Sequence, residues 1–151
     1  MLLSNVSIYK QILEESYSKM NAFIEEGRTP KKDGTDGYII KADPNHNSFK
    51  QSMIVIVFTG MWLEAMLHQE IVSRFGKNTF KEHDRSSYRN KLTLLGISDT
   101  DLLNNVDLFK STRKELVHEK AFFDRDGIKV TQREAERAHK IMECILHALD
   151  C

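Results

Sequence analysis

Residues 48–75, SFKQSMIVIVFTGMWLEAMLHQEIVSRF, are the longest apolar stretch of the chain, and their periodicity decides its fold class. The β-branched run IVIVF at 54–58 is compatible with a strand. The apolar pattern continues as far as Val72, however, which is too long for one. Ser48 is a suitable N-cap residue, and Gly76 is a suitable helix stop. We therefore expect one largely buried helix over this stretch.

The N-terminal part of the chain predicts a second helix and a loop. Apolar residues recur at three- and four-residue intervals over 2–26, and Gly27 ends this pattern. Residues 28–47 are polar and contain two prolines and two glycines, with YII as their only apolar island. We expect a long loop here, with a short strand at YII as an alternative.

The C-terminal half predicts the rest of a bundle. A helix is expected over 86–95, ending at Gly96, and another begins at the candidate caps Ser98, Asp99 and Thr100. DRDG at 124–127 indicates a turn, after which Thr131 and Glu134 form a capping-box pattern for the last helix. The whole chain, 1–151, is therefore predicted to be a single all-α domain, a helical bundle of four or five helices.

Composition excludes few functions. Lys plus Arg and Asp plus Glu both number 22, so a nucleic acid would have to be bound by a local patch of positive charge. The N-terminus lacks the features of a signal peptide, and the stretch 53–67 contains Glu64 and is shorter than the roughly 20 residues of a membrane span. Cys144 and Cys151 are spaced for neither a disulfide nor a zinc site. We expect a cytoplasmic protein with no membrane association.

Familiar enzyme signatures are absent from the sequence. It has no phosphate-binding glycine loop, no H-E-x-x-H zinc motif, no paired CxxC and no G-x-S-x-G elbow. Surface or satisfied core roles are expected for five of the six histidines, namely His46, His68, His83, His139 and His147. Neither a metal nor a cofactor is expected.

Glu64 is a carboxylate within the most apolar helix. A buried, unpaired carboxylate is costly, so this side chain must point outward or meet a cation. Two interpretations stay open: Glu64 marks the polar edge of its helix, or it pairs with an Arg from another helix.

The stretch STRKELVHEK, residues 111–120, contains Arg113 and His118. A permanently charged guanidinium and an imidazole that titrates near neutrality suit phosphodiester cleavage, because RNA supplies its own 2′-hydroxyl nucleophile. Positions five apart on an ideal helix differ by about 140° in direction, so the spacing alone does not bring the two side chains together. They would converge if the helix ends or distorts near His118, or if a symmetric dimer presents both to a shared cleft. The pattern also occurs by chance in many helices.

The wider stretch DLFKSTRKELVHEKAF resembles the signature of the HEPN superfamily, in which an Arg precedes a His by four to six positions on a late helix of an α-helical bundle. The earlier GMWLEAMLHQEI resembles that family's first core helix, with Glu64 as its embedded acidic residue. The likeness covers residues 48–151, which leaves 1–47 as an N-terminal helix and polar loop elaboration. Lys114 departs from the Asn, Asp or His that directly follows the Arg in many active members.

The resemblance implies a metal-independent endoribonuclease of a toxin–antitoxin or defence system, with RNA as its substrate and its cleft at a homodimer interface. Arg113 would stabilise the phosphate, and His118 would act as general acid or base. Lys114, Lys110 and Lys120 would contact the RNA backbone or add local positive charge, and Glu64 would orient Arg113. An antitoxin or a nucleotidyltransferase would be its partner. The alternative is a noncatalytic HEPN-like domain that binds nucleotides or a protein partner.

Overall fold

The computed structural model describes residues 4–40, 43–116 and 125–150, and the side chains of 40 and 125–130 are not described. This part of the chain confirms the all-α prediction. It contains six α-helices, a short 3₁₀ turn and a two-stranded hairpin: α1 (Asn5–Glu26), β1 (Arg28–Pro30), β2 (Tyr38–Ile40), η1 (Pro44–His46), α2 (Asn47–Phe75), α3 (Lys77–His83), α4 (Tyr88–Leu94), α5 (Thr100–Lys114) and α6 (Arg125–Leu149).

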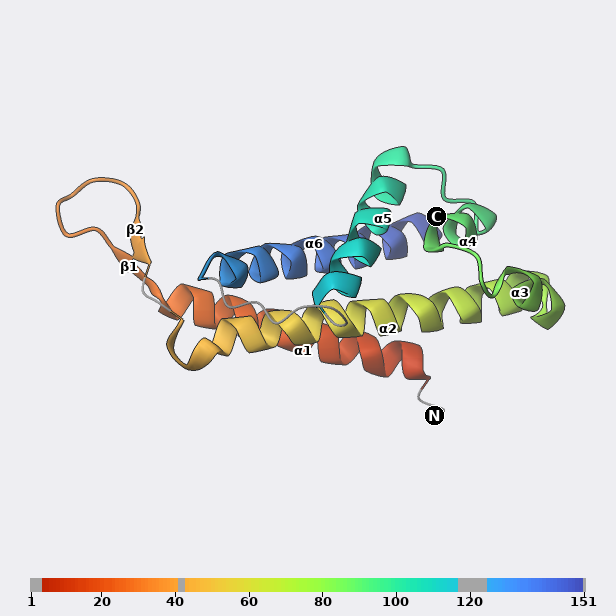
Figure 1. Ribbon diagram of the computed structural model, residues 1–151, viewed down its shortest axis with the longest axis horizontal. Helices are drawn as coiled ribbons and strands as arrows, with labels where there is room; N and C mark the ends of the chain where they lie inside the picture. Colours follow the sequence, from red (N-terminus) through yellow and green to blue (C-terminus); the bar gives the residue numbers. More distant parts are fainter. Residues whose placement is uncertain (1–3, 41–42, 117–124, 151) are drawn as a thin grey trace.

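Three long helices form the body of the bundle. In Figure 1, α1 and α6 run along α2, and both pack against it. Helix α5 crosses this layer, and its C-terminal end meets α2 near the middle of that helix (Figure 1). The hairpin projects from one end of the body, and α3 and α4 lie at the other. The site discussed below lies where the end of α5 reaches α2.

The core is a single cluster of apolar side chains centred on α2. Ser4 caps α1, whose side chains Leu13 and Met20 are fully buried, so the N-terminal helix contributes to the same core as the rest of the bundle. Helix α6 contributes both small and large residues to this core. The principal core residues of α2, α4, α5 and α6 are Val55, Ile56, Trp62, Leu63, Leu67, Ile71, Leu92, Val106, Ala135, Ala138, Met142 and Ile145.

Helix α2 confirms the central prediction, but a different residue caps it. The helix ends before Gly76, whose φ of 88° lies in the region that favours glycine. At the other end, the carboxylate of Asp43 accepts hydrogen bonds from the backbone N–H groups of Ser48 (3.1 Å) and Phe49 (3.0 Å). Ser48 is buried inside the helix and is not its cap, contrary to the prediction, because its hydroxyl accepts instead from Gln132 of α6.

Two predictions for the connections were wrong. The stretch before α4, where the sequence analysis predicted no helix, forms the short helix α3, so the described residues contain six α-helices. Helix α6 begins at Arg125, so Thr131 lies within it and is buried rather than capping its start. Residues 125–127 are accordingly helical and not a turn.

The loop before α2 contains a short strand at YII, which the sequence analysis gave as an alternative. β1 and β2 pair antiparallel, with Thr29 opposite Ile39. Tyr38 and Ile39 are largely exposed, so the hairpin is not covered by the described part of the body.

One described segment, Pro44–Phe75, is long and apolar enough to cross a membrane by length and composition. The sequence expectation considered only the shorter stretch 53–67. Half of the apolar window is buried inside the structure, and a core helix passes the same test.

Candidate functional site

Arg113 continues the core-facing stripe of α5. Leu102, Val106 and Phe109 follow one another at helical spacing and are buried, and Arg113 comes four residues after Phe109. Its side chain is only 23% exposed. The last turn of α5 therefore presents a guanidinium where the preceding turns present apolar side chains.

Gly60 of α2 makes room for this guanidinium. A Cβ atom at position 60 would lie 2.3 Å from Arg113 Nε and 2.6 Å from Cδ and Cζ, which is closer than such atoms approach. The Nε atom is buried and has no hydrogen-bond partner within the described part of the chain. The absence of a side chain at Gly60 is thus what allows Arg113 to lie flat against α2.

Glu64, one turn further along α2, forms an ion pair with the Arg113 guanidinium. Arg113 Nη1 donates to Glu64 Oε1 at 2.9 Å, and the Tyr88 hydroxyl of α4 donates to the same oxygen at 2.5 Å. Arg113 Nη1 also lies 3.3 Å from the Tyr88 oxygen. Burial raises the pKa of Tyr88, and its hydrogen bond to the Glu64 carboxylate and that group's charge raise it further, so the hydroxyl stays protonated and donating.

Both interpretations of Glu64 hold at once. Its side chain is 54% exposed, as expected at the polar edge of α2, and it pairs with an Arg from another helix. The contact predicted from the sequence, Glu64 with Arg113, is therefore present. Its role in orienting Arg113 for a reaction stays a prediction.

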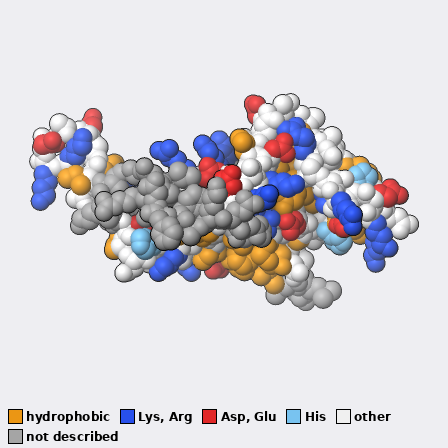
Figure 2. Space-filling view, in the orientation of Figure 1, with side chains coloured by type: hydrophobic (Ala, Val, Ile, Leu, Met, Phe, Trp, Pro, Cys, Tyr) orange, Lys and Arg blue, Asp and Glu red, His pale blue; other side chains and the backbone are white. Residues whose placement is uncertain are grey.

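These residues line an open groove of about 520 Å³ between α2, α4 and α5. Lys110 and Lys114 lie on its wall with Ser111, and the Lys110 ammonium is 5.6 Å from the centre of the Tyr88 ring. Asp107, also on the wall, pairs with Arg89 of α4 at 2.7 Å. On the face shown in Figure 2, basic and acidic side chains are intermixed.

His118 and Lys120 lie outside the described residues, so the structure does not place them. The described chain does show where α5 stops. The α-helix ends at Lys114, and residues 115–116 are π-helical. This change of helix type lies between Arg113 and His118 in the sequence.

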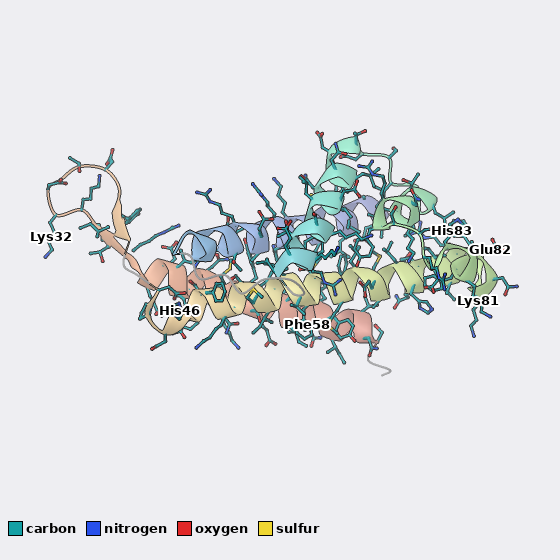
Figure 3. The ribbon with its side chains drawn as sticks, viewed as in Figure 1. Lys32, His46, Phe58, Lys81, Glu82 and His83 are labelled. Atoms are coloured by element: carbon teal, nitrogen blue, oxygen red, sulfur yellow. The ribbon has the colours of Figure 1, made fainter. Side chains whose placement is uncertain are left out.

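Three of the other histidines have contacts that need no ligand. His139 stacks on Tyr17, with ring centres 3.8 Å apart, and His68 packs edge-on against Phe80. His83 Nδ1 lies 2.9 Å from the carbonyl oxygen of Thr79. Figure 3 shows His46 and His83 near opposite ends of α2, and no group of three potential metal ligands gathers among the described residues.

Sequence reasoning did not identify Gly60 or Tyr88 as site residues. Gly60 carries a signal, because a glycine inside a helix is unfavourable by about 1 kcal/mol relative to alanine and often marks a close approach. Tyr88 carries none, since its hydroxyl reaches Glu64 across 24 positions of sequence through the placement of α4.

The geometry therefore joins Arg113, Glu64, Tyr88 and Gly60, with Lys110 and Lys114 beside them. Comparison of the chain with protein-family models, with curated proteins and with solved structures finds no match. The functional argument consequently depends on the groove itself and on the sequence pattern around Arg113.

Proposed function

We propose that this protein is a metal-independent endoribonuclease in which Arg113 and His118 act on a phosphodiester of RNA. The main support is the state of Arg113: a cation held by two other helices at the floor of an open groove. Lys110 and Lys114 on the same wall favour a polyanionic ligand. A guanidinium buried for packing alone would not require a groove lined with two further cations.

The proposed reaction needs only acid–base and electrostatic groups. An imidazole removes the proton from the 2′-hydroxyl, whose oxygen attacks the adjacent phosphorus. The bond from phosphorus to the 5′-oxygen breaks, and that oxygen leaves with a proton. The products are a 2′,3′-cyclic phosphate and a 5′-hydroxyl end. Arg113 stabilises the charge that develops on the phosphoryl oxygens, and His118 moves the protons.

Arg113 is suited to this task because its position is fixed before a substrate arrives. Donors that are already oriented need not reorganise during the reaction, which is where such groups gain most of their effect. Glu64, Tyr88 and the surface of Gly60 fix Arg113 from three sides. A homodimer, in which each copy adds its Arg113 and His118 to a shared cleft, completes the proposal.

The experiment is an RNA-cleavage assay on Arg113→Ala and His118→Ala, each compared with the purified unmodified protein. We expect both variants to lose about a hundredfold or more in rate. Matched controls are Arg137→Ala, an exposed Arg of α6 paired with Glu134, and His139→Ala, which removes the ring stacked on Tyr17. Both controls should retain the original rate, with folding checked by circular dichroism.

Several outcomes would count against this function. Undiminished cleavage by a folded His118→Ala protein would remove the proposed acid–base group. Cleavage abolished by a chelator and restored by a divalent ion would indicate a metal site instead. RNA binding with no cleavage by the unmodified protein would favour the noncatalytic alternative, and light scattering that finds only monomers across concentrations would contradict the shared cleft.

A further inference from the structure

The hydrogen-bond donors of Arg113 are unequally used. A guanidinium has five N–H groups. Nη1 makes both bonds that the described residues provide, to Glu64 and to Tyr88, and Nε is buried against Gly60. Among the described residues, Nη2 has no hydrogen-bond acceptor, so this nitrogen can donate to an acceptor of a ligand. The direction in which Nη2 points depends on the acceptors that fix Nη1.

Glu64 alone would fix the position of the Arg113 guanidinium only weakly. Its side chain is more than half exposed, and an exposed ion pair typically contributes little because water screens it and both side chains lose freedom. The Tyr88 hydroxyl changes this, because it donates to the same Oε1 atom that accepts from Arg113. A carboxylate oxygen bound by two donors from two other helices has a defined position.

Tyr88 is itself held in place by its own helix. Ser87 caps α4 by accepting from the N–H of Asn90, which fixes the first turn where Tyr88 lies. The next residue, Arg89, bonds to Asp107 (2.7 Å) and Asn104 (2.6 Å) of α5. These bonds link α4 to the helix that carries Arg113, and the fully buried Leu92 packs α4 into the core, so the Tyr88 hydroxyl and the guanidinium lie on packed elements.

We propose that Tyr88 is a positioning residue of this site: its hydroxyl keeps Glu64 on Arg113 Nη1 and so directs Nη2 toward the groove and a phosphate oxygen. This inference rests on the proposed function. It assigns Tyr88 no contact with the RNA. Lys110, whose ammonium lies over the Tyr88 ring, is left to attract the backbone.

The test is Tyr88→Phe, which removes the hydroxyl and keeps the ring and net charge. We expect kcat to fall about tenfold, the effect of one lost orienting hydrogen bond. The affinity for RNA with a 2′-deoxy substitution at the cleavage position, which cannot be cut, should change by less than about threefold. A purely structural tyrosine would not produce this split between kcat and binding. Tyr9→Phe is the matched control, because Tyr9 is a half-buried tyrosine whose ring packs on Phe58 of α2.

A second measurement does not depend on cleavage. Nitrogen-15 NMR of the arginine side chains reports how fast the guanidinium of Arg113 rotates, with its signal assigned from its loss in Arg113→Lys. We expect slow rotation in the unmodified protein and in Tyr9→Phe, and faster rotation in Tyr88→Phe. Glu64→Gln, an exposed substitution that removes only the charge, should accelerate it as well.

The two proposals fail separately. If the unmodified protein does not cleave RNA, the proposed function fails, while the rotation rates still decide whether Tyr88 holds Arg113. Unchanged rotation in folded Tyr88→Phe overturns the positioning role. Unchanged kcat in that variant also overturns it, even if cleavage by the unmodified protein is confirmed.

Discussion

Helix α2 meets its neighbours in two different ways. Toward α1 and α6 it lies in an apolar core to which Leu13, Met20, Ala138 and Met142 contribute, all essentially inaccessible to solvent. Toward the end of α5 it offers Gly60 and Glu64, and the facing side chain is Arg113. The first contact follows the general rule for bundle cores, whereas the second replaces apolar packing with a charge network.

The second contact is locally unfavourable in ways that the first is not. Gly60 costs about 1 kcal/mol relative to alanine in a helix, and an unsatisfied buried donor such as Arg113 Nε costs about 1–3 kcal/mol. Such local costs tend to gather at functional sites. We therefore expect the α1–α2–α6 contact to carry the stability of the fold and the α2–α5 contact to carry the proposed chemistry.

The largest expected effect is on the apolar side. Leu67→Ala removes a side chain that is 1% exposed, and we expect the free energy of unfolding to fall by about 2–5 kcal/mol through lost burial and a residual cavity. Urea denaturation followed by circular dichroism measures this. The folded fraction should keep its normal rate of RNA cleavage.

Leu108→Ala is the matched control, because Leu108 of α5 is largely exposed. Its free energy of unfolding should change by less than about 0.5 kcal/mol. A comparable loss in both variants would break the assignment of stability to the buried cluster.

Gly60→Ala sharpens the comparison from the polar side, because activity should fall while stability changes little. The new methyl group occupies the place of the Arg113 guanidinium, which must shift away from Glu64 and Tyr88. We expect a loss of about tenfold or more in cleavage rate from the misplaced cation. The free energy of unfolding should change by less than about 1 kcal/mol, because the helix propensity gained with alanine is offset by the displacement of the buried guanidinium. Cleavage kinetics and urea denaturation of one preparation check both.

Ser73→Ala is the control for helix propensity, since Ser73 is exposed on the same helix and far along it from the groove. It should raise stability slightly and leave cleavage unchanged. Normal cleavage by Gly60→Ala would mean that the position of Arg113 does not matter for the reaction.

The apolar side of the comparison could be predicted from the sequence, and the polar side only in part. The long periodic run of α2 predicts its helix and its burial, because hydrophobic spacing is a local property. Pairing of Glu64 with an Arg could be proposed because Glu64 is a carboxylate within the most apolar helix, and the resemblance around Arg113 suggested that residue as the partner. Their bond joins residues 49 positions apart, and only the packing of α5 on α2 brings it about.

The errors have the same origin. Ser48 had the chemistry of a cap, but the carboxylate of Asp43, five residues earlier, accepts hydrogen bonds from the first turn of α2 instead, with η1 between Asp43 and the helix. Thr131 and Glu134 matched a capping box, yet they lie within α6. Short capping patterns do not show whether a longer amphipathic helix runs through them. Tyr88 could not be found at all, because its role depends on the position of α4.

The smallest expected effect lies at the start of α2, away from the groove. Burial raises the pKa of Asp43, but hydrogen bonds from the N–H groups of Ser48 and Phe49 more than offset this, so the pKa lies below the usual value of an aspartate. Because the folded pKa is lowered, the stabilisation is present above the unfolded value and disappears as pH falls through the folded pKa. Asp43→Ala should therefore lose about 1 kcal/mol of unfolding free energy at pH 7 and progressively less below about pH 4.

Asp43→Asn keeps an oxygen acceptor and should lose less. Urea denaturation across this pH range measures the difference, and RNA cleavage at pH 7 should be normal in both variants. A loss of cleavage would show that the start of α2 and the groove are coupled, and the division of α2 into a stabilising and a chemical side would no longer hold.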